Sequence, residues 1–215
     1  MTPGSTHVVH CPSCDQLGAY PSIASGNTFG AVYYTDGRRV APMLPDAPSV
    51  VCCGGCSGVF WLELATEVGE YSPWGSDVES IDPTWTCAAR LVEPDEQQYL
   101  AALEQLVAAQ PQRAREARLF AWWRGNDRLR GERPSGSNDT PQIISQRHAN
   151  MRQLIALLDT AEPSDQLMRA EALRQLGEFD QAVAILSKPF PHEHDTALSR
   201  LLGLCAQRDT VLQKL

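Results

Sequence analysis

The sequence predicts an α+β fold, with a small antiparallel β unit first and an α-helical, repeat-like bundle after it. Three observations support this order. Two C-x-x-C pairs lie among strand and hairpin signals in the first 64 residues, a helical periodicity begins near Pro94, and two later helices meet at a glycine turn. We therefore expect a β domain over 1–66, a connecting loop over 67–90 and a helical domain over 91–215.

Two cysteine pairs, CPSC at 11–14 and CGGC at 53–56, organise the β unit. Four thiolates are the ligand set of a closed tetrahedral zinc site, and two intervening residues let both sulfurs of a pair reach one ion. Glycines in the second pair tolerate a tight turn and let backbone amides approach the sulfurs. These positions predict one structural zinc ion with the ligands Cys11, Cys14, Cys53 and Cys56.

Several alternatives remain open for this site. The 38 residues between Cys14 and Cys53 exceed the usual separation of two such pairs, about 15–20 residues. Cys52 is an alternative to Cys53, and His7 or His10 is close enough in sequence to replace a cysteine. The same four cysteines also suit iron or reversible thiol redox chemistry.

Composition places the chain among ordinary globular proteins. Its 215 residues are 43% hydrophobic and 20% charged. No basic segment followed by an apolar run opens the sequence, so we expect no signal peptide. The most apolar window, 50–64, is too short to span a membrane, so we expect no membrane partner. We expect a cytoplasmic protein with reduced thiols, where C-x-x-C pairs are typical of metal binding.

The β unit is the acidic part of the chain. The formal net charge of −8 divides into −9 for residues 1–96, +2 for 97–141 and −1 for 142–215. Nucleic-acid binding needs cations that displace counterions from phosphates. A nucleic-acid role for the β unit is therefore disfavoured, and a structural or protein-binding role is favoured.

Strand and turn signals alternate through the β unit. We expect strands near 7–10, 19–23, 31–35, 38–40 and 49–51. Asp36-Gly37 is a strong signal for the hairpin turn between the third and fourth of them. The run 59–64 either completes the sheet or opens a helix. Residues 6–64 should then form one small twisted sheet with the metal at one end.

Helical periodicity predicts helices over 94–111, 112–124, 142–159 and 195–213, with a loop over 131–141. The second of these helices begins a basic and aromatic patch, which comprises Arg113, Arg115, Arg118, Trp122, Trp123, Arg124, Arg128, Arg130 and Arg133. Such a patch suits a phosphate backbone or the acidic surface of a partner. The plainer interpretation is a solvated helix face that pairs with the acidic β unit.

Residues 164–188 read as a helical hairpin. The positions that matter are Ala170, Leu173, Leu176, Gly177, Phe179, Ala182 and Leu186. Small side chains permit close helix approach and the glycine permits a sharp turn, and together these positions resemble a single tetratricopeptide repeat. One repeat cannot bury its own apolar face, so the helices at 142–159 and 195–213 should pack beside it.

The first part of the chain resembles zinc ribbons, with rubredoxin-like knuckles at 11–14 and 53–56. Together with the repeat-like helices it resembles bacterial proteins of unassigned role that join such a ribbon to a helical region. The resemblance implies an architecture and no reaction.

No familiar enzyme signature occurs in the sequence, which lacks G-x-S-x-G, Walker, H-E-x-x-H and Rossmann motifs. The run HEHD at 192–195 suits a helix cap or a weak second metal site. We predict a non-enzymatic zinc-binding protein whose helical region holds a protein partner. One alternative is a redox or electron-transfer protein that uses the same four cysteines. The other is a nucleic-acid-binding module that uses the patch from Arg113 to Arg133.

Overall fold

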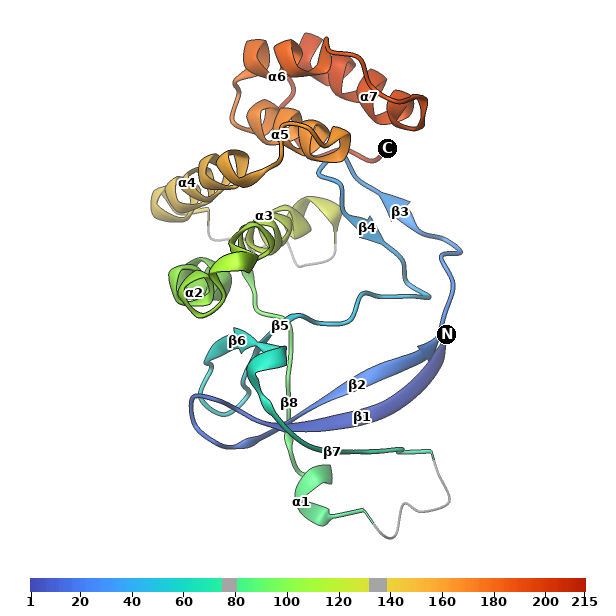
Figure 1. The fold of residues 1–215 in the computed structure, drawn as a ribbon, viewed down its shortest axis with the longest axis vertical. Helices are drawn as coiled ribbons and strands as arrows, with labels where there is room; N and C mark the ends of the chain where they lie inside the picture. Colours follow the sequence, from blue (N-terminus) through green and yellow to red (C-terminus); the bar gives the residue numbers. More distant parts are fainter. Residues whose placement is uncertain (75–80, 132–138) are drawn as a thin grey trace. The chain divides into compact units, whose positions relative to one another are not determined.

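The structure, a computed structural model, describes residues 1–74, 81–131 and 139–215 (Figure 1). The chain divides into two compact units. The N-terminal unit comprises Met1–Ala31 and Ala41–Gln98, and the helical unit comprises Val32–Val40 and Tyr99–Leu215. Strands dominate the first unit and helices the second, so the predicted α+β class is confirmed.

The main sheet of the N-terminal unit has the strand order β7-β1-β2-β8. Its strands are β1 (Thr2–His10), β2 (Leu17–Ser25), β7 (Thr66–Tyr71) and β8 (Ala89–Arg90). β1 is antiparallel to β2 and to β7, whereas β8 is parallel to β2. Gly18 allows the close approach of Leu91, since a Cβ at position 18 would lie 2.5 Å from Leu91 Cδ2.

A second, two-stranded sheet pairs β5 (Val50–Cys52) with β6 (Val59–Trp61). Every residue of both strands is buried, which explains their uninterrupted apolar sequence. The chain then turns through the 3-10 helix η1 (Leu62–Leu64). The run 59–64 therefore begins as a strand and ends as a helical turn, so each of the two expected outcomes describes part of it.

The expected single sheet over 6–64 is wrong. The hairpin of β3 (Val32–Tyr33) and β4 (Arg39–Val40) forms, with Gly37 at φ +78° in its turn, but it belongs to the helical unit. The reason is the turn residue Asp36, which is fully buried and accepts a 2.8 Å hydrogen bond from Asn126 Nδ2. A buried carboxylate needs such partners, and residues 99–215 supply them.

The segment 67–90 was expected to be a connecting loop, but it contains β7, the helix α1 (Pro83–Thr86) and β8. Gly69 lies within β7, beside a register shift in the pairing with β1. A glycine at a β-bulge is compatible with a strand. Residues 75–80 of the expected loop lie outside the described residues.

The main helices of the helical unit are α2 (Glu96–Ala109), which begins in the N-terminal unit, α3 (Ala114–Arg130), α4 (Pro141–Leu157), α5 (Pro163–Gln175), α6 (Phe179–Leu186) and α7 (Asp195–Ala206). Short 3-10 turns, η3 (Pro111–Arg113) and η4 (His192–His194), precede α3 and α7. Consecutive helices pack against each other from α3 to α7. Within the described ranges no helix combines the length and the apolar character that crossing a membrane requires.

Two helix ends differ from the sequence prediction. α3 continues past Arg124 to Arg130, because Asn126 and Asp127 are buried in polar contacts rather than exposed in a loop. α7 ends at Ala206, where Arg208 follows in the left-handed region at φ +52°. The chain after it is extended, and Leu215 donates its backbone N–H to the carbonyl of Tyr33 at 2.9 Å.

The helical hairpin expected at 164–188 is present as α5 and α6. Gly177 adopts φ +79° between the helices, and a small core forms from Ala170, Leu173, Phe179, Ala182 and Leu186. Leu201 and Cys205 of α7 join this core. The hairpin therefore buries its apolar face with the help of the neighbouring helix α7.

Candidate metal centre

Two backbone turns of the same design present the four cysteines. In the first turn Cys11 donates its N–H to the carbonyl of Gln16 and accepts at its own carbonyl from Asp15, both at 2.9 Å. In the second, Cys53 makes the equivalent bonds to Gly58 and from Ser57, also at 2.9 Å. These bonds fix both cysteines of each pair on one side of a tight turn.

The fifth residue of each turn adopts the left-handed conformation. Asp15 has φ +62° and Ser57 has φ +59°. Glycine most often occupies such a position, and non-glycine residues there carry some strain. The strain accompanies a turn that aims two sulfurs at one point.

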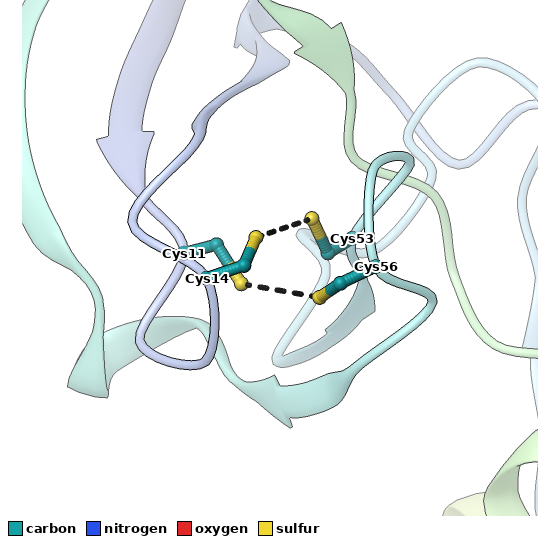
Figure 2. Close-up of side chains that lie close together, drawn as sticks. All are labelled: Cys11, Cys14, Cys53 and Cys56. Atoms are coloured by element: carbon teal, nitrogen blue, oxygen red, sulfur yellow. Dashed lines mark hydrogen bonds between the residues drawn. The ribbon is translucent and has the colours of Figure 1, made fainter.

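The four sulfurs converge. Their Sγ atoms all lie within 4.8 Å of one another, and the Cys11–Cys56 and Cys14–Cys53 pairs lie at 3.8 Å (Figure 2). A tetrahedral ion with bonds of about 2.3 Å to sulfur requires sulfurs about 3.8 Å apart. The observed separation therefore fits a metal ion at the centre of the four thiols.

Backbone amides surround the sulfurs. Ser13 donates its N–H to Cys11 Sγ at 3.4 Å, Gly55 to Cys53 Sγ at 3.3 Å and Gly58 to Cys56 Sγ at 3.4 Å. Such N–H groups stabilise thiolate charge and orient metal-bound sulfur. The predicted role of the glycines, to leave amides free to approach, agrees with these contacts at Gly55 and Gly58.

Without a metal the clustered thiols hold their protons unequally. Burial raises the pKa of Cys11. Amide N–H donors at Cys56 and Gly55 lower the pKa of Cys53 to about 7 despite its burial. For Cys14, burial and the neighbouring sulfurs outweigh the amide of Gln16 and raise the pKa to about 12. A cation at the centre would favour all four thiolates and displace the remaining protons.

The structure brings together Cys11, Cys14, Cys53 and Cys56, whereas Cys52 lies outside this cluster. Cys52 is the last residue of β5, and its buried sulfur accepts a hydrogen bond from Gln98 Nε2 at 3.3 Å. Adjacent residues of an extended chain face opposite sides, so only one of Cys52 and Cys53 can face the centre.

The histidines considered as ligands also have other contacts. His10 Nδ1 lies 2.8 Å from the carbonyl oxygen of Asp15, and His7 stacks on Tyr20. His192 Nδ1 lies 3.2 Å from Asp195 Oδ2 at the start of α7. Among the described residues, the four cysteines are the group of ligand side chains close enough to share an ion.

The described arginines of the patch form ion pairs with acidic residues of the helical unit. Arg118 is buried and pairs with Glu104 at 3.1 Å, and Arg113 donates to Glu116 at 2.6 Å. The remaining described arginines of the patch pair with acidic residues of the same unit: Arg115 with Asp165, Arg124 with Asp127, Arg128 with Asp139, and Arg130 with Asp36 and Asp127. Arg133 lies outside the described residues.

The tryptophans of the patch are also engaged. Trp122 has no exposed surface and donates from Nε1 to Gln175 at 2.9 Å. Trp123 donates from Nε1 to the carbonyl of Asp36 at 3.0 Å. The described members of the patch are therefore engaged in pairs and do not form a free basic and aromatic surface. The expected pairing with the acidic β unit occurs at Arg130, whose partner Asp36 lies within residues 1–66. The other acidic partners lie within residues 99–215.

The buried polar network around Asp36 was not predicted from the sequence. Arg130 pairs there with Asp36 and with Asp127, and all three side chains are fully buried. Asp36-Gly37 is also a typical hairpin turn, so no separate sign in the sequence marks the Asp36 carboxylate as a buried hydrogen-bond and ion-pair partner. The polar residues at 126, 127 and 130, at the end of an otherwise apolar helix face, were the available signal.

Comparison of the chain with protein-family models, with curated proteins and with solved structures gave no match.

Proposed function

We propose that this chain is a non-enzymatic zinc protein, in which one structural Zn²⁺ bound by Cys11, Cys14, Cys53 and Cys56 stabilises the N-terminal unit. The observation that carries the proposal is the 3.8 Å separation of the sulfurs across the two turns. It matches the edge of a tetrahedron around zinc. The centre lies beside the small core of Val9, Val51, Phe60 and Leu91, so a bound ion would cross-link the strands of that core.

A structural role follows from the ligand set. Four protein thiolates fill a tetrahedral zinc ion and leave no position for water or substrate. Two of the sulfurs belong to residues that are almost completely buried, Cys11 and Cys53. In a reducing cytoplasm these thiols would stay available for the metal.

X-ray absorption at the zinc edge tests the coordination directly. We expect four sulfur neighbours at about 2.3 Å and no oxygen neighbour. A mixed nitrogen or oxygen shell would contradict the four-cysteine assignment. An iron-loaded, red protein would favour the redox or electron-transfer alternative, which uses the same cysteines.

We infer that the helical unit holds a protein partner. Its support is the row of consecutively packed helices from α3 to α7, which keeps exposed apolar side chains at Leu157 and Val183. A photo-crosslinking amino acid at either position should capture one partner in cells. The same probe at the exposed Phe29, in the N-terminal unit, is the control. Equal capture from all three positions would contradict a helical docking face.

The nucleic-acid alternative loses its support, because the described arginines of the patch pair with acidic residues. A basic surface already neutralised in this way releases few counterions from a phosphate backbone.

A further inference from the structure

The candidate metal centre is unequally protected from solvent. Cys11 and Cys53 are 1% and 2% exposed, Cys14 is half-buried, and Cys56 is exposed. The residues that flank Cys56, Gly55 and Ser57, are exposed as well. A small oxidant in solvent therefore has the most direct access to the sulfur of Cys56.

The sulfur of Cys56 lies next to a sulfur of the opposite turn. Cys11 Sγ is 3.8 Å away, and Figure 2 shows the two side chains pointing toward each other from the two loops. Cys14 and Cys53 form the second such contact, also at 3.8 Å. A Cys11–Cys56 disulfide requires these sulfurs to approach by roughly 1.8 Å, to the usual bond length of about 2.05 Å.

We propose that Cys56 is the site at which a peroxide oxidises this centre, and that Cys11 then forms a disulfide with it and the zinc leaves. The proposal rests on the proposed function, because it takes a zinc-thiolate centre as its starting point. It adds an oxidative modification site and a defined product.

The chemistry balances in two steps. The Cys56 thiolate attacks hydrogen peroxide, so that a sulfur–oxygen bond forms, the oxygen–oxygen bond breaks and hydroxide leaves. The sulfur loses two electrons to the peroxide. The Cys11 thiolate then attacks the Cys56 sulfur, a disulfide forms, the sulfur–oxygen bond breaks and a second hydroxide leaves.

Loss of two ligands opens the centre. Only Cys14 and Cys53 remain as thiolates, and half of a four-sulfur shell does not hold zinc as the closed site does. A dithiol reductant reverses the step by thiol–disulfide exchange and restores the four thiols. The modification therefore couples peroxide exposure to reversible loss of the cross-link in the N-terminal unit.

The test uses the zinc-loaded full chain in a Cys87→Ser background, because Cys87 is an exposed thiol outside the centre. Hydrogen peroxide is added in steps, and zinc release is followed with a chromogenic chelator. Dimedone traps sulfenic acid, and mass spectrometry of tryptic peptides locates the adduct and any disulfide. We expect the first adduct on Cys56, a Cys11–Cys56 disulfide without dimedone, and zinc release in step with it.

Two histidine variants sharpen the test, since imidazole keeps a zinc ligand while it removes the oxidisable sulfur. Cys56→His should slow peroxide-driven zinc release by at least about tenfold, because access governs thiol oxidation. Cys14→His is the matched control and should remain sensitive, since Cys56 is still present. If Cys56→His does not bind zinc, the adduct and disulfide maps of the Cys56-containing protein decide the question.

The possible outcomes separate this inference from the proposed function. A first adduct on Cys14, a Cys53–Cys56 disulfide, or a zinc centre inert to peroxide overturns the oxidation site while the zinc protein stands. A protein that binds no zinc before peroxide is added overturns the proposed function itself.

Discussion

Cys52 and Cys53 are neighbours with different surroundings, and the difference indicates which of them belongs to the candidate metal centre. Cys53 Sγ lies 3.8 Å from Cys14 Sγ, whereas Cys52 Sγ accepts from Gln98 Nε2 at 3.3 Å. Both residues are buried, so burial alone does not distinguish them. The distinction lies in the direction of each side chain, which alternates along an extended chain.

Substitution of each cysteine by serine tests this assignment. Cys53→Ser should abolish stoichiometric zinc binding and unfold the N-terminal unit, because the free energy of zinc binding, on the order of 10 kcal/mol, is also folding free energy. Cys52→Ser should retain zinc and lose only about 1–2 kcal/mol of unfolding free energy. Metal analysis and urea unfolding measure both effects. Equal loss of zinc in the two variants would contradict the assignment.

Protonation of the metal-free thiols makes zinc binding depend on pH. The pKa of Cys14 is raised to about 12 and that of Cys11 is raised by burial, so both thiols keep their protons at neutral pH. Zinc must displace these protons, and its apparent affinity should therefore rise from about pH 6 to about pH 8. Titration calorimetry in two buffers of different protonation enthalpy measures the protons released. Identical enthalpies in both buffers would be inconsistent with protonated thiols.

At the scale of elements, the α5–α6 hairpin depends on one glycine for its turn and on small residues for its packing. Gly177 has φ +79°, a backbone conformation that residues with a Cβ adopt only at a cost in free energy. Ala170 and Ala182 are buried where the core forms. These features were visible in the sequence because turn chemistry and helix periodicity are local properties.

Two glycine-to-alanine substitutions separate backbone strain from steric overlap. A Cβ at Gly177 or at Gly203 would meet no atom within 4 Å, but only Gly177 has a positive φ. Gly177→Ala should therefore lower the unfolding free energy by about 1 kcal/mol. Gly203→Ala, within helix α7, should raise it by about 0.5–1 kcal/mol. Thermal unfolding followed by circular dichroism compares them, and a destabilised Gly203→Ala would refute this explanation.

Element boundaries that depend on distant contacts could not be predicted. α3 extends through Asn126 and Asp127 because partners from the 32–40 hairpin bury them, including Asp36 and Arg38. β7 forms despite Gly69 because the edge of β1 pairs with it. The clustering of the four cysteines was predicted because its signal is the spacing within each pair. The acidic partners of the arginines were not all predicted, since the most distant of them lies 94 residues away in the sequence.

For the whole molecule, the main consequence is that the hairpin 32–40 separates the two cysteine pairs in sequence but belongs to the helical unit. Asn126 and Arg130 both depend on the carboxylate of Asp36. The C-terminal segment also pairs with the hairpin, since Thr35 donates its N–H to the carbonyl of Gln213 at 2.9 Å. A domain boundary near residue 91, as predicted from the sequence, separates the hairpin from the residues of the helical unit with which it pairs.

A fragment comprising residues 91–215 should consequently fail to unfold cooperatively, because Arg130 stays buried without one of its two carboxylate partners. Val32–Val40 appended after Leu215 through a short glycine-serine linker should restore the transition. The antiparallel pairing of Tyr34 with Lys214 places the two segments suitably for this fusion. Urea unfolding monitored by tryptophan fluorescence reports the result. A cooperative transition in the fragment without the hairpin would show that the hairpin is dispensable.

The central claim is the four-cysteine zinc centre, and metal analysis combined with thiol titration tests it most directly. The full chain is purified without added metal, and its zinc, iron and reactive thiols are counted before and after chelation. We predict one zinc per chain and rapid reaction of the exposed Cys87 before chelation. After chelation the four ligand thiols should react as well, together with Cys52, which unfolding of the N-terminal unit exposes. Iron in place of zinc, or no metal and a disulfide within the C-x-x-C pairs, would contradict the account.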